Sequence, residues 1–237
     1  MKWIFDLEAD GLLDTATQVW CGVFRNVDTG EVRKFYNEDP YYLHHMLKFM
    51  DTCETLIGHN VLGYDFPLLE KLYGYKYKGE KIDTLVLSKL LNPKRPVPWS
   101  CPVKNRPHSV ETWGYRVGRG KPEHNDWSQF SPEMLHRCTE DTEIQNLIFL
   151  ALLEEMKEGN WQFASWLTNR LFDILGKQEA YGWKVDKEWM EYIIHMSTRW
   201  IDKIDKALRP HLPLVLEIQE TKCKGEYKYA KTPFVKS

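Results

Sequence analysis

The chain has 237 residues, of which 43% are hydrophobic and 14% aromatic, and its formal net charge is −2. This composition is typical of a globular protein with one sizeable core and room for part of a second unit. The five cysteines are odd in number and form no C-x-x-C pair, so neither a disulfide framework nor a zinc knuckle is indicated and a reducing compartment is expected. The acid at position 6 argues against a signal peptide, and no apolar run approaches the ~20 residues that span a bilayer. We therefore expect a soluble, cytoplasmic protein.

Residues 3–36 predict a meander of strands. Trp3–Leu7 and Gln18–Phe24 are apolar runs with strand composition. The turn sequence Asp28-Thr29-Gly30 then leads into a further strand over Glu31–Tyr36.

Helical and extended segments alternate after this meander. The spacing of apolar residues predicts helices over Tyr41–Met50 and Phe66–Tyr73, with a short buried strand, Thr55–Gly58, between them. Asp83 is placed to cap the N-terminus of a helix over Leu85–Leu91.

Five prolines in residues 93–107 exclude a regular element there, and a short helix is expected over His108–Tyr115. Between Lys94 and Lys121 there are seven basic side chains and one acid, Glu111. Such a local patch can steer a phosphate backbone although the net charge is near zero; the alternative is a solvated loop.

A long helix is predicted from Ser131 onwards. Ser131 is an N-cap residue, Pro132 takes the first helical position, and apolar spacing carries the helix to about Met156.

The segments that follow predict only helices, over residues 163–181 and 187–208, and the sequence after 214 is polar and Lys-rich. Strands first, then a mixture, then helices indicate an α/β domain of residues 1–157 followed by a helical segment of residues 161–237.

Carboxylates embedded in local patterns carry the functional signal. Asp6 and Glu8 lie two apart in the apolar run Trp3-Ile4-Phe5-Asp6-Leu7-Glu8, so on a strand they project from one face. Two such carboxylates raise each other's pKa unless a cation sits between them, and acids in an apolar strand are costly unless paired or metal-bound. Oxygen ligands of this kind suit Mg²⁺ or Mn²⁺, which indicates metal-assisted phosphoryl chemistry.

These residues resemble a known set of motifs. Asp6-Leu7-Glu8, Asn60-x-x-x-Tyr64-Asp65 and Asp141 on a helix resemble the three exonuclease motifs of the DEDD superfamily, which has the RNase H-like fold. Residues 1–157 are most similar to the 3′→5′ proofreading domain of bacteriophage family A DNA polymerases, and Ile82–Leu90 and His108–Arg116 also resemble segments of that domain.

The resemblance implies an α/β fold with a mixed sheet flanked by helices and a site for two divalent ions, Mg²⁺ or Mn²⁺. It assigns Asp6 as the ligand that both ions share, Glu8 and Asp141 as completing the ion that activates water, and Asp65 as holding the second ion, partly through water.

One position departs from the family. A Tyr that orients the attacking water is expected four residues before the last Asp, where this chain has Arg137, and a related subfamily has His five before it, where this chain has His136. If the helix from Ser131 is continuous, a residue four before Asp141 is only ~40° from the same face and Arg137 points to the site; if it starts later, His136 swings in from a loop. Arg is no general base, but its fork can grip the scissile phosphate.

Further residues are candidates for holding the substrate. The last bases of a single strand can stack against exposed aromatic and apolar side chains, and a polar side chain at the corner after residue 58 can reach a phosphate. For Phe66, core packing is the equal alternative. The substrate-binding candidates are Asn60, Tyr64, Phe66, Leu12 and Leu13.

The sequence therefore predicts a metal-dependent 3′→5′ exodeoxyribonuclease acting on a single-stranded DNA 3′ end. Residues 179–186 resemble the entry into a polymerase domain, whose fingers and palm are absent from this sequence. The resemblance therefore implies a fragment or one half of a split polymerase, with no polymerase activity of its own. It also implies the cytoplasm of an infected bacterium as the location, and the other polymerase half or other replication proteins as partners. An RNA 3′ exonuclease on the same fold and a non-catalytic DNA-binding or assembly module remain alternatives.

Overall fold

The computed structural model describes residues 1–122, 124–212, 216–219 and 226–229. Their contacts divide the chain into two compact units, residues 1–181 and 182–237. None of the described helices is both long and apolar enough to cross a bilayer.

The first unit is built on a five-stranded mixed sheet with the strand order β3-β2-β1-β4-β5. The pairs β1–β2 and β2–β3 are antiparallel, whereas β1–β4 and β4–β5 are parallel. The strands are β1 (Lys2–Ala9), β2 (Val19–Asn26), β3 (Val32–Tyr36), β4 (Thr55–Gly58) and β5 (Glu80–Asp83).

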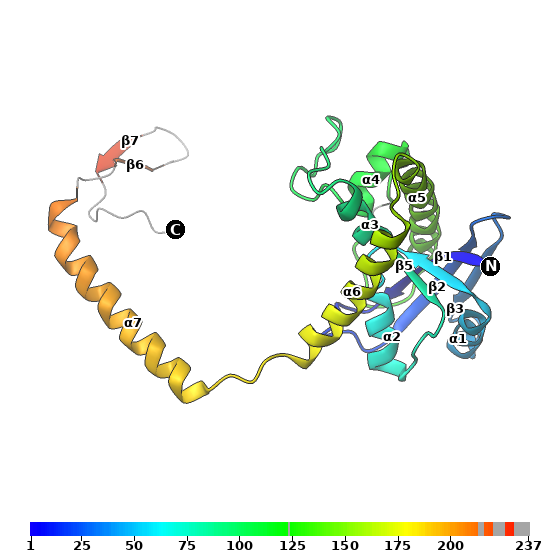
Figure 1. Cartoon of the computed structure of the whole chain (residues 1–237), viewed down its shortest axis with the longest axis horizontal. Coiled ribbons are helices and arrows are strands. Elements are labelled where there is room, and N and C mark those ends of the chain that lie inside the picture. The colour runs from blue at the N-terminus through cyan, green and yellow to red at the C-terminus, as the bar shows by residue number, and fades with distance from the viewer. Residues whose placement is uncertain (123, 213–215, 220–225, 230–237) are drawn as a thin grey trace. The chain divides into compact units, whose positions relative to one another are not determined.

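Helices cover both faces of this sheet (Figure 1). The helices of the first unit are α1 (Tyr42–Thr52), α2 (Asp65–Tyr73), α3 (Thr84–Leu91), α4 (Val110–Val117), α5 (Pro132–Met156) and α6 (Gln162–Tyr181). The core cluster that joins β1 and β2 to α1 and α2 contains Trp3, Phe5 and Leu7, while Ile4 on the opposite face of β1 packs with Phe149 of α5. The mixed sheet flanked by helices confirms the predicted fold class.

Local sequence signals set the ends of most helices. The Asp83 carboxylate accepts hydrogen bonds from the backbone N–H groups of Leu85 and Val86, and the Ser131 hydroxyl accepts one from Met134 with Pro132 in the first turn. These caps and the continuous helix from Pro132 to Met156 confirm the prediction.

Other elements differ from expectation. The fifth strand, β5, was not predicted because Glu80 and Lys81 make it polar at the sheet edge. The helix predicted over His108–Tyr115 begins two residues later, because the Ser109 hydroxyl caps it, and ends at Gly118 in the left-handed conformation that glycine favours.

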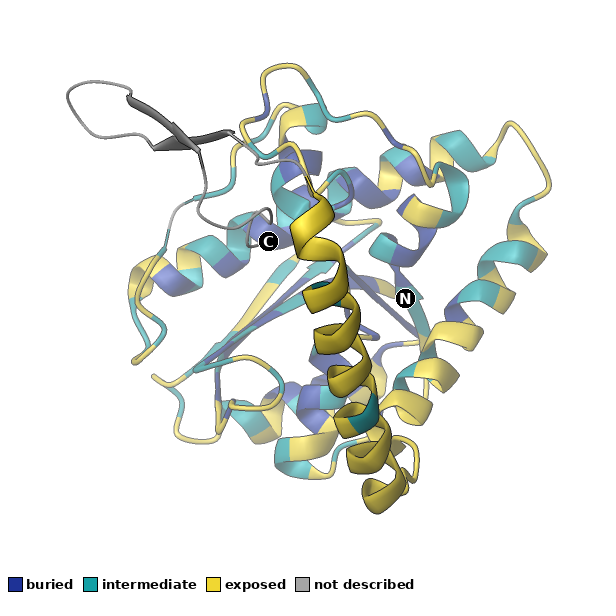
Figure 2. Cartoon of the chain, turned by 90° about the vertical axis from the view of Figure 1, so that its left-hand side faces the viewer, coloured by how far each residue is buried: buried dark blue, intermediate teal, exposed yellow. Residues whose placement is uncertain are grey.

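The second unit contains α7 (Lys187–Leu208), a short 3₁₀ helix (Arg209–His211) and the antiparallel pair β6 (Leu216–Gln219) and β7 (Glu226–Tyr229). The helix matches the prediction, and the two strands were not predicted. The other residues after 214, where little burial was expected, lie outside the described residues. No residue of α7 is buried, and Figure 2 shows it exposed along its length.

Candidate active site

The strand β1 presents its two acids to the helix α5. Alternation along β1 puts Trp3, Phe5 and Leu7 into the core on one face, so Asp6 and Glu8 project from the other. The long helix α5 packs across β1 and β2 on that second face and carries Asp141, which is buried.

Three carboxylates meet there. One oxygen each from Asp6, Glu8 and Asp141 can be chosen so that all three lie within 4.8 Å of one another. The fold thus brings Asp141 to Asp6 and Glu8, although Asp6 and Asp141 are 135 positions apart in the chain.

The fourth predicted acid, Asp65, lies beside this group but is not one of the three. It is the first residue of α2 and is 4% exposed. Burial, followed by repulsion from the Asp6 carboxylate, raises the pKa of Asp65 well above its usual value. The Asp65 carboxylate therefore lies within the electrostatic influence of Asp6.

Burial and the repulsion between neighbouring carboxylates raise the pKa values of the two acids on β1. Burial first, and then the charge of Asp141, raises the pKa of Asp6 to about 7. Burial and the charges of Asp6 and Asp141 raise the pKa of Glu8 to about 8. A cation placed among these oxygens would offset both the cost of burying their negative charge and their mutual repulsion.

Two side-chain cations already stand at the cluster. The Lys121 ammonium lies 2.5 Å from Asp141 Oδ2, and Arg137 Nε lies 3.7 Å from Glu8 Oε1 and 3.9 Å from Asp141 Oδ2. The other oxygen, Asp141 Oδ1, is buried and has no hydrogen-bond partner among the residues that the structure describes. A buried carboxylate oxygen without a donor fits a metal ion, so these residues suit a divalent cation.

The continuous helix decides which of the two candidate residues before Asp141 faces the site. Arg137, one turn earlier on α5, lies against Glu8 and Asp141, stacks on Trp127 at 4.9 Å and donates to the carbonyl of Pro122. His136 is exposed and lies about 100° further round the helix.

Residues that the sequence patterns did not single out support the cluster. Gln145 Nε2 donates to Asp6 Oδ1 at 2.8 Å, and its Oε1 accepts from the His59 backbone N–H at 3.1 Å, so Gln145 ties β1 to the corner after β4. Its position four residues after Asp141 on one helix face was an available signal. Cys138 Sγ contacts the Asp6 carbonyl oxygen at 3.3 Å. Lys121 lies in a loop, and apart from the basic stretch of residues 94–121 no sequence pattern indicated that it would pair with Asp141.

The corner that leads to Asp65 is held by hydrogen bonds. Asn60 has a positive φ of 68°, which Asn tolerates better than most residues. Asp83 accepts from the backbone N–H groups of Asn60 and Leu62, so the cap of α3 also shapes the turn before α2.

The predicted substrate-binding residues fall into three groups by exposure. Asn60 and Leu12 are exposed, the latter by 77%. Tyr64 is half-buried with its hydroxyl donating to the Gly11 carbonyl, and Leu13 packs partly against the core. Phe66 is 7% exposed and packs in the core, with Phe5 at 5.2 Å and Tyr77 stacked at 5.6 Å. The stacking role proposed for Phe66 is replaced by core packing, because the ring is enclosed on the apolar face of the sheet.

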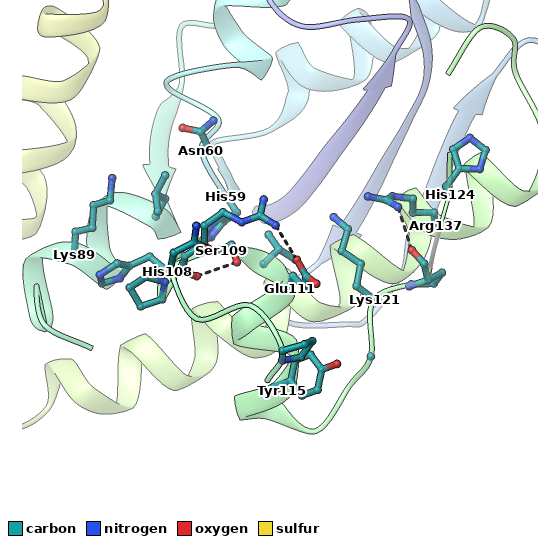
Figure 3. Close-up of a pocket in the computed structure, with 18 of the residues that line it drawn as sticks. His59, Asn60, Lys89, His108, Ser109, Glu111, Tyr115, Lys121, His124 and Arg137 are labelled. Carbon is teal, nitrogen blue, oxygen red and sulfur yellow. Dashed lines mark hydrogen bonds and ion pairs between the residues drawn. The ribbon is translucent and has the colours of Figure 1, made fainter. Parts of the chain in front are cut away.

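A pocket of about 1050 Å³ lies beside Lys121 and Arg137 (Figure 3). None of the four predicted metal-binding acids lines it, but Lys121 and Arg137 do, so these two cations join the pocket to the cluster. Its lining also includes Glu111 and the polar residues Lys89, Arg106, His59, His108, His124 and Asn60.

The structure refines the basic patch of residues 94–121. Arg95 is 8% exposed and makes a bidentate pair with Glu155, and Arg119 pairs with Glu140. Of the seven basic residues, Arg106 and Lys121 line the pocket, so part of the patch fixes the Pro-rich loop and part faces the cavity.

Known proteins share both the sequence pattern and the fold. No family model matches the chain. The DNA-directed DNA polymerases of Escherichia phage T7 and Enterobacteria phage T3 are each 27% identical over 186 residues, which covers 64% of this chain and 26% of the polymerase. Brucella melitensis NrnC superposes with a TM-score of 0.57 and 15% identity, covering 77% of this chain and 86% of that one. Escherichia coli RNase D gives a TM-score of 0.53 at 15% identity, with coverages of 75% and 45%. The chain therefore has the RNase H-like fold of the DEDD-type exonucleases and is similar to bacteriophage DNA polymerases, of which it spans about a quarter.

Proposed function

We propose that this chain is a metal-dependent 3′→5′ exonuclease that hydrolyses DNA phosphodiesters from a single-stranded 3′ end, as the proofreading part of a phage DNA polymerase. The observation that carries the proposal is the meeting of Asp6, Glu8 and Asp141 within 4.8 Å on the face of the sheet that α5 covers. Similarity to the two phage polymerases supports DNA as the substrate.

The residues that would hold metal are the four acids. Asp6 would be shared by two ions, with Glu8 and Asp141 completing one and Asp65 serving the other. Two Mg²⁺ or Mn²⁺ ions, when bound, supply an activated water and charge stabilisation for the departing 3′ oxygen. A solved structure of the similarly folded NrnC holds Mg²⁺, which supports the choice of a divalent ion.

The chain's own side chains would position the substrate. Arg137 lies against Glu8 and Asp141 and also lines the pocket, so its guanidinium is placed to grip a phosphate at the acids. The exposed Leu12 and Asn60 are free to contact the last nucleotides. No side-chain base is required of His136, which is exposed on the helix.

The test is 3′-end shortening of 5′-labelled single-stranded DNA with Mg²⁺ or Mn²⁺. Wild type should shorten the strand from its 3′ end and stop in excess chelator, and Asp6→Ala should lose at least about a hundredfold in rate because three ligands cannot hold both ions. Asp14→Ala, an exposed acid on the adjacent loop, is the matched control. Shortening that persists in Asp6→Ala would contradict the assignment of the site.

The same assay on RNA separates the first alternative. Escherichia coli RNase D, whose fold this chain shares, is described as an exoribonuclease involved in structured RNA processing. A faster rate on RNA than on DNA of the same sequence would favour that reaction. Binding of either strand without Asp6-dependent shortening would leave a DNA-binding or assembly module.

The polymerase similarity also suggests a partner. The chain spans 26% of the T7 polymerase, and α7 exposes large apolar side chains such as Trp189, Trp200 and Ile204. We propose that the remaining polymerase portion covers this helix, in the cytoplasm of an infected bacterium. This chain alone should add no nucleotide to a primed template, which a primer-extension assay checks.

A further inference from the structure

The Asp141 carboxylate is paired with side-chain cations on one of its oxygens. Oδ2 lies 2.5 Å from the Lys121 ammonium and 3.9 Å from Arg137 Nε, while Oδ1 has no hydrogen-bond partner within the described part of the chain. The Asp141 side chain is 3% exposed and that of Lys121 is 22% exposed, so the ion pair is largely shielded from water.

Arg137 links this ion pair to Glu8. The same Arg137 Nε lies 3.7 Å from Glu8 Oε1 and 3.9 Å from Asp141 Oδ2, which places those two oxygens around one point. An ion that joins Glu8 to Asp141 would share the Asp141 carboxylate with the Lys121 ammonium, whichever of its two oxygens it takes, and two cations on one carboxylate repel each other. Entry of a divalent ion and retention of the Lys121–Asp141 pair therefore oppose each other.

The alternative place for the ammonium is the adjoining pocket. Lys121 and Arg137 both line it, and Figure 3 shows their side chains close together on one wall. Lys121 follows Gly120 in a loop without regular structure, and its four-carbon stem allows the ammonium to move while the backbone stays. An ammonium beside the acids and beside Arg137 is a suitable partner for a phosphate held at the metal.

We propose that Lys121 is a phosphate-binding residue that Asp141 retains until a divalent ion displaces it. The inference rests on the proposed function, because it takes the acids as a metal site and a phosphodiester as the substrate. It couples the two ligands: metal releases the ammonium for the phosphate, and by reciprocity phosphate strengthens metal binding.

The first test is Mn²⁺ affinity by titration calorimetry on the full chain. Lys121→Met keeps the length of the side chain and removes the competing charge, so it should bind Mn²⁺ more tightly, by on the order of tenfold. Lys89→Met is the matched control, since Lys89 lines the same pocket and has no ion-pair partner in the part of the chain that the structure describes. It should stay within about twofold of wild type. Equal or weaker binding by Lys121→Met would overturn the proposal.

The second test follows Lys121 in the wild-type chain and does not depend on a variant folding. An amine-acylating reagent followed by mass spectrometry should modify Lys121 faster when Mn²⁺ is added, because its ion pair is released, while Lys89 labelling stays unchanged. Unchanged Lys121 labelling at saturating Mn²⁺ would sink this inference alone. A wild-type chain that takes up no Mn²⁺ in the calorimeter would instead sink the proposed function.

The third test measures the coupling itself. Fluorescence anisotropy with a labelled oligodeoxythymidylate carrying hydrolysis-resistant phosphorothioate linkages reports binding in chelator and in Mn²⁺. Wild type should gain more affinity on Mn²⁺ addition than Lys121→Met does, by about fivefold or more. Equal gains in both proteins would show that Lys121 does not reach the phosphate.

Discussion

Each of the two acids on β1, Asp6 and Glu8, lowers the stability of the fold when it is charged, and only the two together can serve the proposed metal site. Asp6 lies beneath α5, and its carboxylate accepts a hydrogen bond from the Gln145 side chain. A carboxylate largely removed from water and close to other acids is costly when charged, which is why the pKa values of Asp6 and Glu8 are raised. The stability of the metal-free protein must therefore depend on pH in a defined direction.

In the unfolded chain Asp6 and Glu8 titrate near their ordinary values of 3.8 and 4.5, and in the folded chain at about 7 and about 8. The folded state binds more protons across that interval, so the free energy of unfolding should fall as pH rises from about 4 to about 8. Melting in chelator at about pH 5 and about pH 8.5 checks this, and Asp6→Asn should flatten the dependence while Asp14→Asn should not. Saturating Mn²⁺ should restore more stability at the higher pH, because metal binds the deprotonated acids. A wild-type melting temperature that rises with pH in chelator would contradict the raised pKa values.

At position 137 the chain has an Arg where the resemblance leads one to expect Tyr. Because α5 is continuous, a Tyr placed there would start from the same helix face, beside Glu8 and Asp141. Arg137→Tyr should therefore retain the exonuclease rate or raise it by up to about tenfold, a barrier change of ~1.4 kcal/mol. Arg137→Ala, which has neither a cation nor a hydroxyl, should be slower than both in the same end-shortening assay. A folded but inactive Arg137→Tyr would show that the two side chains do not serve an equivalent position.

The elements around the site are fixed by hydrogen bonds between segments distant in the sequence. The helix α6 is linked to the corner before α2 by way of Asp83. The Oδ1 of Asn169 on α6 accepts a hydrogen bond from the buried backbone N–H of Asp83 at 2.8 Å. Asp83 in turn holds the backbone N–H groups of Asn60 and Leu62. A helix expected to belong to a separate segment thus supports the turn that presents Asp65.

Replacing Asn169 should show how much this hydrogen bond contributes to the unfolding free energy. Asn169→Ala leaves the Asp83 N–H buried without a partner and should cost about 1–3 kcal/mol of unfolding free energy. Gln178→Ala, at an exposed position of the same helix, should stay within about 0.5 kcal/mol of wild type. Chemical denaturation of both variants measures the difference, and equal losses would mean that Asn169 is merely another helix residue.

For the molecule as a whole, the contacts put α6 with the sheet and α7 in a second unit. Lys81 of β5 pairs with Asp173 of α6 at 3.2 Å, which adds to the Asn169 contact. The predicted boundary at residues 157–161 would separate these partners, whereas a boundary after residue 181 keeps them.

Two truncations test where the first unit ends. A chain of residues 1–181 should melt cooperatively at a temperature close to that of the first unit in the full chain. A chain of residues 1–157 loses Asn169 and Asp173 and should melt at least several degrees lower or precipitate. Differential scanning calorimetry compares the two. If residues 1–157 were as stable as residues 1–181, α6 would be an appendage and not part of the fold.

Interactions between close neighbours in the sequence were enough to predict much of this protein. The N-caps at Asp83 and Ser131 act within one helical turn, so the sequence predicted the continuous helix α5 that carries Arg137. The alternation of side chains along β1 depends on the strand alone, so the sequence also predicted that Asp6 and Glu8 share a face. The strand β5 did not, because its polar residues pair with β4 some 25 positions earlier and carry no apolar signal of their own.

What only the tertiary structure decided are contacts between side chains from different elements. The pairing of Lys121 with Asp141, the bond from Gln145 to Asp6 and the burial of Phe66 against Tyr77 each depend on how the loops and helices pack on the sheet. Sequence determined the acids and the faces that carry them, because backbone geometry is local. Folding determined which cations stand beside those acids, because charge pairing depends on distance in space and not on distance along the chain.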